Sequence, residues 1–300
     1  MNLEANYRLH LARKERDEQD KERDEQEIVR KSRLYELAPI SEITKRGWIQ
    51  TTDLIDELEQ SVCQFLGITS PEESPQITIN FRHSQTNTPE TQAQIAWLKR
   101  VEHLSKEQKV AKFERVVLKQ AIPDILTQAV NPENLRRIPT LLLSLGVHFV
   151  VVPHLQKTYL DGAAFYLNGN PVVALTLRYD RIDCFWFTLM HELAHITTGH
   201  KGIYLDDLDK GDINAEESAA NRLSRDWLLN SEAFAAFVKA TKPYFSRKCI
   251  EQFAQSQGRH PGIVLGRLQR ENEVGYKHLR TLLVKVSPYL QEWIDVPTPQ

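Results

Sequence analysis

The stretch from Phe185 to Ile196 constrains the fold of this chain more than any other. Its sequence, Phe-Trp-Phe-Thr-Leu-Met-His-Glu-Leu-Ala-His-Ile, leaves almost no polar side on a helix. A helix that is apolar nearly all round belongs in the core of a protein. The same stretch nevertheless carries His191, Glu192 and His195, which are costly to bury without partners. The sequence therefore predicts a buried helix with a polar centre.

The spacing of these polar residues indicates what could partner them. His191 and His195 are four residues apart, so on a helix they project from one face about one turn apart. This spacing lets both imidazoles bind one tetrahedral Zn²⁺, with Glu192 beside the open position of the metal. The alternative is a pair of core histidines bonded to backbone carbonyls, with Glu192 at the rim of the core. We favour the metal site, because an HExxH motif within a buried helix is what a zinc peptidase requires.

A third ligand is expected on the next helix, which begins near Asn214. A catalytic zinc site usually has three protein ligands and leaves one position for water. Glu217 and Asn221 are four residues apart and share a helix face, so Glu217 could complete a His₂Glu site. Asn221 could then bond the free nitrogen of a ligand histidine. Two alternatives stay open: Glu217 could belong to a capping box that starts at Asn214, or Glu216 could be the ligand instead.

Composition narrows the class of protein. The chain has 300 residues, of which 41% are hydrophobic, enough for one large domain or two modest ones. A formal net charge of −2 gives no overall field that would favour nucleic acid. The cysteines Cys63, Cys184 and Cys249 are widely spaced, which indicates reduced thiols in a cytosol. The start of the chain is too charged for a signal peptide, and no apolar run of about 18 residues exists. We therefore expect a cytoplasmic protein without membrane contact.

Patterning divides the chain into four parts. We expect a long charged helix or linker over residues 1–38 and a helical scaffold over residues 39–130. Residues 131–275 are expected to form an α+β unit that contains the HExxH helix and a small β-sheet. Residues 276–300 are expected to form a terminal element and a tail. The predicted fold class is therefore α+β and predominantly helical.

The first part has an unusual charge pattern. Residues 2–37 contain neither glycine nor proline and are predicted to form one helix. The pentapeptide Glu-Arg-Asp-Glu-Gln starts at Glu15 and again at Glu22, a spacing of seven. Without apolar a and d positions this repeat provides no coiled-coil seam. We favour a solvated helix that links two parts, with a partner-binding arm as the alternative.

Periodicity predicts the remaining elements. Helices are expected over residues 53–66, 88–104, 109–122 and 131–145, and strands over residues 76–81, 147–152, 163–167 and 172–177. Pro123 is expected to interrupt the third of these helices, and Asn168-Gly169-Asn170 is a hairpin signal. Residues 279–288 are predicted to form a short element. Asp183, just before the apolar run, could cap or aim the HExxH helix. An extended peptide could add to a strand edge beside the metal cleft.

These motifs resemble those of the ImmA/IrrE metallopeptidases. The resemblance rests on HELAHITTGH at residues 191–200 and EESAANRLSRDWLL from Glu216. It extends to LDGAAF at residues 160–165, RYDRID at residues 178–183 and HPGIVLGRL at residues 260–268. The chain looks most like the branch in which the peptidase follows an Xre-type helix-turn-helix domain, as in HigA-like regulators. The specific motifs span about residues 130 to 275, with a looser likeness over residues 3–50.

The resemblance implies a fold, an activity and a partner. It implies a zincin-like domain and a cytoplasmic, zinc-dependent endopeptidase that cuts a helix-turn-helix repressor in a stress, defence or mobile-element response. His191, His195 and Glu217 carry over as ligands of one zinc ion, and Glu192 carries over as the catalytic base. The implied partner is therefore a protein substrate, either a transcriptional repressor or a component of a defence system.

The sequence departs from the family pattern in two ways. Ala219 stands where many members have a second acidic residue, which supports Glu217 as the ligand. No helix-turn-helix pattern precedes the helix at residues 2–37, so we expect no direct nucleic-acid binding by this chain. The N-terminal helices are instead a candidate surface for oligomer formation.

Two points of the mechanism remain open in the sequence. A donor should stabilise the oxyanion of a peptide-bond hydrolysis, and His200 and Tyr179 are the candidates. His200 follows Gly199, so it could equally be a cation at the negative end of the helix dipole.

The alternative function is a regulatory, antitoxin-like binding module that uses the zincin fold as a sensor or interaction surface. The intact HExxH motif argues against it, because a binding module needs no base beside the metal.

Overall fold

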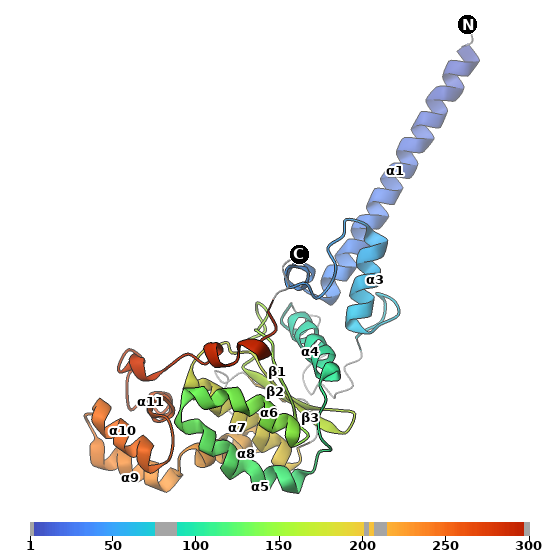
Figure 1. The fold of residues 1–300 in the computed structure, drawn as a ribbon. Helices are drawn as coiled ribbons and strands as arrows, with labels where there is room; N and C mark the ends of the chain where they lie inside the picture. The colour runs from blue at the N-terminus through green and yellow to red at the C-terminus, as the bar shows by residue number, and fades with distance from the viewer. Residues whose placement is uncertain (1–2, 76–88, 201–203, 207–214, 297–300) are drawn as a thin grey trace. The chain divides into compact units, whose positions relative to one another are not determined.

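The computed structural model describes residues 3–75, 89–200, 204–206 and 215–296 (Figure 1). Within these ranges the chain forms two compact units. The first contains residues 3–75 and 89–96, and the second contains residues 97–200, 204–206 and 215–296. Among the described helices, none is both long enough and apolar enough to cross a membrane.

The first unit is helical. It contains α1 (Leu3–Leu37), α2 (Ile40–Lys45), α3 (Ile55–Leu66) and the start of α4 (Pro89–Glu107). The long helix predicted over residues 2–37 is confirmed from Leu3 to Leu37, and the helix predicted over residues 53–66 ends at Gly67 in a left-handed conformation (φ 69°). Arg30 fastens α1 to α3 by donating hydrogen bonds to Asp56 (2.7 Å) and Glu59 (3.0 Å).

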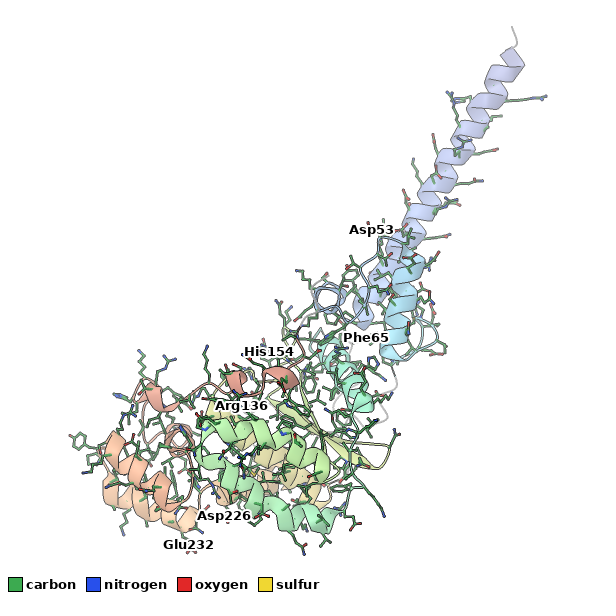
Figure 2. The ribbon with its side chains drawn as sticks, in the orientation of Figure 1. Asp53, Phe65, Arg136, His154, Asp226 and Glu232 are labelled. Atoms are coloured by element: carbon green, nitrogen blue, oxygen red, sulfur yellow. The ribbon has the colours of Figure 1, made fainter. Side chains whose placement is uncertain are left out.

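The first half of α1 is solvated. Every residue from His10 to Gln26 is exposed, and in Figure 2 the side chains project from this part of the helix on several sides. This agrees with the prediction of a helix without a coiled-coil seam, because no apolar stripe is available to bury.

The second unit is built on a four-stranded sheet in the order β1-β3-β2-β4. Its strands are β1 (His148–Val151), β2 (Gly162–Leu167), β3 (Asn170–Leu175) and β4 (Tyr204–Asp206). β1 runs parallel to β3, whereas β2 pairs antiparallel with β3 and with β4. Asn168 (φ 51°) and Gly169 (φ 90°) form the two-residue turn that joins β2 to β3. The hairpin prediction is therefore confirmed, as is the strand expected over residues 147–152.

The second unit also contains α4 from Trp97 on and a series of further helices (Figure 1). They are α5 (Arg115–Thr127), α6 (Ile138–Ser144), α7 (Ile182–Thr198), α8 (Ala215–Leu228), α9 (Ser231–Thr241), α10 (Arg247–Ser256) and α11 (Pro261–Arg270). Short 3₁₀ turns lie at Gln128–Val130, Pro132–Arg137, Arg280–Leu282, Ser287–Tyr289 and Gln291–Trp293. The α+β, predominantly helical fold class is confirmed.

The HExxH helix, α7, lies at the centre of this unit. It packs against β2 and β3 on one side and against α5, α8 and α11 on others. Most of its apolar side chains are at most 2% exposed, whereas Phe187 is partly buried: Phe185, Trp186, Leu189, Met190, Leu193, Ala194 and Ile196 have the low values. The prediction of a buried helix is confirmed, and α7 belongs to the main hydrophobic core of the unit.

Several boundaries differ from the sequence prediction. α5 begins at Arg115 rather than near residue 109, and it continues through Pro123 to Thr127. The helical stretch predicted from residue 131 is a 3₁₀ turn followed by α6, and the element predicted over residues 279–288 consists of 3₁₀ turns. The strand predicted over residues 76–81 lies outside the described residues.

The division into units also differs from the predicted one. Residues 97–130 and 276–296 lie in the same unit as residues 131–275. The reason is burial, because Leu118, Ile122 and Ile125 of α5 belong to the core that surrounds α7. A helical pattern in a sequence shows that a face is apolar, but it does not show which element that face packs against.

Candidate metal centre

Both ends of α7 are held in place by local contacts. Arg181, the residue before the helix, donates two hydrogen bonds to the Asp183 carboxylate, at 3.0 and 2.6 Å. Asp183 lies in the first turn, and no side-chain hydrogen bond caps the helix at Arg181, so of the two expected roles the contacts favour aiming the helix over capping it. Asp183 instead contacts Gly266 of α11, where any side chain would collide with the carboxylate. At the other end, Gly199 adopts φ 81° and terminates the helix.

Three donor groups converge between α7 and α8. His191 Nε2 lies 2.9 Å from His195 Nε2 and 3.1 Å from Glu217 Oε2, and His195 Nε2 lies 3.4 Å from Glu217 Oε1. One ligand atom from each residue lies within 4.8 Å of the other two. Both histidines are 1% exposed, and the Glu217 side chain is 17% exposed. The sequence prediction that these three side chains meet is confirmed.

This geometry fits a tetrahedral zinc ion. Two ligand atoms at about 2.0 Å from such an ion lie roughly 3.3 Å from each other, close to the separations between these donors. Each histidine also turns the same nitrogen, Nε2, toward the common point. Two facing lone pairs repel unless a proton or a cation lies between them, so a metal ion would satisfy the whole group. The cluster could therefore hold a metal ion.

The ionisation of Glu217 suits this role. Burial raises the pKa of its carboxyl, but the contacts with the imidazoles of His191 and His195 outweigh that effect and place the pKa below its usual value. Glu217 is therefore a carboxylate at neutral pH, as metal coordination requires. Among the described residues, Glu216 is not part of the convergent group, so the geometry favours Glu217 over the alternative assignment. Asn214, the start of the alternative capping box, lies outside the described residues.

Glu192 is buried in α7 next to the first histidine of the motif. It follows His191 directly and is fully buried, so its carboxylate lies within the protein rather than at the rim. A methyl group added to Gly162 of β2 would lie 2.6 Å from Glu192 Oε1 and 2.6 Å from Thr188 Cγ2. The carboxylate therefore rests against the backbone of β2 at the point where this strand has no side chain.

Gly162 is a residue that sequence reasoning missed as part of the site. Its φ is not in the left-handed region, so no backbone requirement explains the glycine. The close approach of Glu192 and Thr188 leaves no room for a side chain at this position. The available signal was the glycine itself, since a glycine inside a strand often marks a close approach by another group.

We expect Gly162→Ala to impair the base while sparing the metal. The new methyl would displace Glu192 and leave His191, His195 and Glu217 in place, so zinc affinity should stay within about threefold. If Glu192 acts as a general base, hydrolysis should fall by about 10²-fold, the lower end for loss of such catalysis. Zinc titration and the peptide-cleavage assay described below measure the two effects.

Gly275→Ala is the matched control for this change. Gly275 also has an ordinary φ, and an added methyl would meet only the exposed ring of His278 at 3.2 Å. This variant should keep full activity. Equal activity of Gly162→Ala and Gly275→Ala would remove Gly162 from the site.

His200 lies against a ligand histidine. Its Nδ1 is 2.9 Å from His195 Nδ1, and the two ring centroids are 5.2 Å apart. Burial lowers the pKa of the His200 imidazole, and the charge of His195 lowers it further, which favours the neutral ring. The direction of this shift disfavours the cation at the helix end that the sequence also allowed.

The contacts of Asn221 and Tyr179 do not test the roles predicted for these two residues. Asn221 lies on α8 one turn after Glu217, and its role beside a ligand histidine stays a prediction. Tyr179 is 38% exposed, and its ring lies 5.1 Å from the guanidinium carbon of Arg178. Its role as an oxyanion donor likewise stays a prediction.

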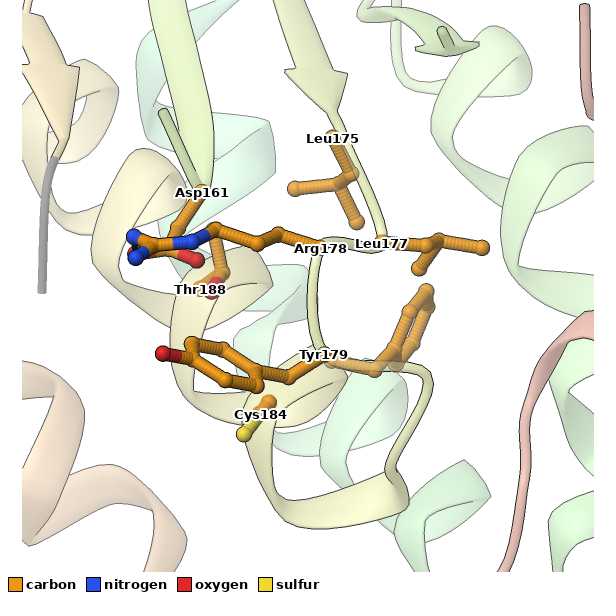
Figure 3. A pocket seen from close by; sticks show the side chains of 8 residues that line it. Asp161, Leu175, Leu177, Arg178, Tyr179, Cys184 and Thr188 are labelled. Carbon is orange, nitrogen blue, oxygen red and sulfur yellow. Dashed lines mark ion pairs between the residues drawn. The ribbon is translucent and has the colours of Figure 1, made fainter. Parts of the chain in front are cut away.

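A small pocket lies along α7 before Glu192 (Figure 3). Tyr179, Cys184 and Thr188 line it, and Arg178 reaches across it toward Asp161, at 3.8 Å between Nη1 and Oδ2. Burial raises the pKa of the Cys184 thiol, and the charge of Asp183 adds to the effect, so the thiol stays protonated and poorly nucleophilic.

The end of α8 is anchored by arginines from the last part of the unit. Arg259 donates to the backbone oxygens of Leu228 and Trp227, each at 3.0 Å. Arg267 donates to the Leu229 oxygen at 2.8 Å. These groups satisfy carbonyls that a helix end leaves without partners, and they fix the helix that carries Glu217.

Comparisons of the chain with protein-family models, with curated proteins and with solved structures found no match.

Proposed function

We propose that this protein is a zinc-dependent endopeptidase. The observation that carries the proposal is the convergence of His191, His195 and Glu217, with the buried carboxylate of Glu192 on the same turn of α7 as His191. Three ligands with one further carboxylate beside them are typical of catalytic zinc sites. Structural sites, in contrast, usually have four Cys or His ligands.

The donor set favours zinc over other common metals. Imidazole nitrogens suit zinc, copper, iron and nickel, whereas magnesium and calcium prefer oxygen donors. Two imidazoles and one carboxylate are the ligands of the His₂Glu class of zinc hydrolases. The packing of the HExxH helix against β2 and β3 is compatible with a zincin-like fold, which is part of this proposal.

The residues of the chain would divide the reaction between them. Zinc in such a site supplies Lewis acidity, which lowers the pKa of water to about 7 and polarises a carbonyl. The Glu192 carboxylate would accept a proton from the attacking water and return it to the leaving amine nitrogen. The burial of Glu192 keeps bulk water away from the proton that it holds. Gly162 gives this carboxylate its space against β2.

The proposed substrate is a regulatory protein of the helix-turn-helix repressor type, cut at a specific site in a cytoplasmic stress, defence or mobile-element response. This part of the proposal is supported by the resemblance of residues 130–275 to the ImmA/IrrE metallopeptidases. The alternative is a binding module that uses the same metal fold without cleaving.

Cleavage by metal-stripped and zinc-loaded protein tests the proposal. The full chain would be stripped with a chelator, reloaded with one equivalent of Zn²⁺ and incubated with a proteome-derived peptide library and a panel of intact helix-turn-helix repressors. We expect recurring new termini, detected by mass spectrometry, in the loaded sample alone. If the loaded protein binds zinc and leaves every substrate intact, the binding-module alternative is favoured.

A further inference from the structure

We propose that His200 is a positioning residue that orients His195 toward the metal. This inference rests on the proposed function and deepens it, because it assigns a role beside the ligands rather than a new ligand. It concerns the contact between Nδ1 of His195 and Nδ1 of His200, which lie 2.9 Å apart.

The end of α7 brings the two rings together. Gly199 adopts φ 81°, which turns the chain back over the last turn of the helix. The backbone N–H of His200 then donates to the His195 carbonyl at 3.1 Å, so the two residues are linked through the backbone and through their rings. The planes of the rings are inclined at 59°, so their contact is a hydrogen bond rather than a stack.

The direction in which His195 Nε2 points decides which ring nitrogens carry the protons. His195 turns Nε2 toward His191 and Glu217, at 2.9 and 3.4 Å, so Nε2 must carry the lone pair that would bind the metal. A neutral imidazole with a free Nε2 carries its proton on Nδ1. His195 Nδ1–H therefore donates to Nδ1 of His200, which accepts with its own proton on Nε2.

This hydrogen bond has two consequences for His195. It fixes the rotation of the ring about the Cβ–Cγ bond, and it selects the tautomer that leaves Nε2 available. An acceptor on the opposite nitrogen also makes the ligand nitrogen more basic. Zinc affinity distinguishes this role from that of an oxyanion donor. Loss of a partner of His195 would weaken zinc binding, whereas loss of a donor to substrate would affect turnover and leave zinc affinity unchanged.

Variants of His200 separate these roles through metal affinity. His200→Phe keeps a ring but has no acceptor, whereas the amide oxygen of His200→Asn can accept near the position of Nδ1. We expect His200→Phe to weaken zinc binding by about 10- to 100-fold, as is typical when a partner of a ligand histidine is removed. We expect His200→Asn to stay within about threefold of the wild type.

Competition with a chromophoric chelator would measure the Kd for Zn²⁺, and the visible spectrum of the Co²⁺-substituted protein would report the ligand geometry. His200→Ala, which also lacks an acceptor, repeats the test with a smaller side chain, and His278→Phe is the control at an exposed histidine. An unchanged Kd and Co²⁺ spectrum in folded His200→Phe or His200→Ala would overturn the positioning role, even if cleavage were lost. Absence of zinc binding by the wild type would instead overturn the metal site itself.

Discussion

Replacing Glu192 with glutamine is expected to leave zinc binding unchanged and to reduce peptide hydrolysis by about 10²- to 10⁴-fold, the range for loss of a general base. The amide has nearly the shape of the carboxylate, so it should fit the space that Gly162 leaves against β2. It cannot accept the proton of the attacking water, which is the step that the proposal assigns to Glu192. Zinc titration and single-turnover cleavage kinetics measure the two properties separately.

Glu232→Gln is the matched control for this change. Glu232 lies exposed in the first turn of α9, a helix distinct from the two that carry the metal ligands, and its substitution should alter neither property. A Glu192→Gln protein that cleaves at the wild-type rate would reject the assignment of Glu192 as the base. Loss of zinc from this variant would instead mean that Glu192 contributes to metal binding.

Replacing Glu217 with alanine is expected to weaken zinc binding by more than about 100-fold, because loss of a group that only supports a ligand already costs 10- to 100-fold. The change removes the single carboxylate among the three convergent donors and leaves two imidazoles, which rarely hold zinc in a catalytic site. Cleavage should be lost together with the metal. Chelator competition measures the first effect, and the library assay measures the second.

Glu216→Gln controls for the neighbouring carboxylate on α8. Glu216 is absent from the convergent group, so this variant should bind zinc as the wild type does. Tight zinc binding by Glu217→Ala would contradict the ligand assignment. Loss of zinc from Glu216→Gln but not from Glu217→Ala would transfer the role to Glu216.

The sequence was sufficient to predict the centre of the site. The period of a helix brings His191 and His195 onto one face. The apolar residues that surround them in the sequence indicate a buried helix. Four-residue spacing on α8 and the need of a catalytic zinc for a third ligand made Glu217 a candidate, but the residues alone left Glu216 and a capping box open. The hairpin at Asn168 and Gly169 followed from residues that tolerate positive φ.

The sequence was insufficient where contacts between distant elements decide. The role of Gly162 depends on how closely β2 approaches α7, which no pattern within either element reveals. The position of α5 in the core depends on which neighbour covers its apolar face. β4 is three residues long and depends on its pairing with β2, so it has too short a pattern to recognise. The contact of His200 with His195 depends on the turn at Gly199.

X-ray absorption at the zinc edge of the reloaded protein tests the central claim most directly. The account predicts one zinc ion per chain, with nitrogen and oxygen ligands at about 2.0–2.1 Å from it. It also predicts the outer-shell signal that two imidazoles give, and no sulfur ligand. A sulfur shell at about 2.3 Å, or failure of the protein to retain zinc, would contradict it.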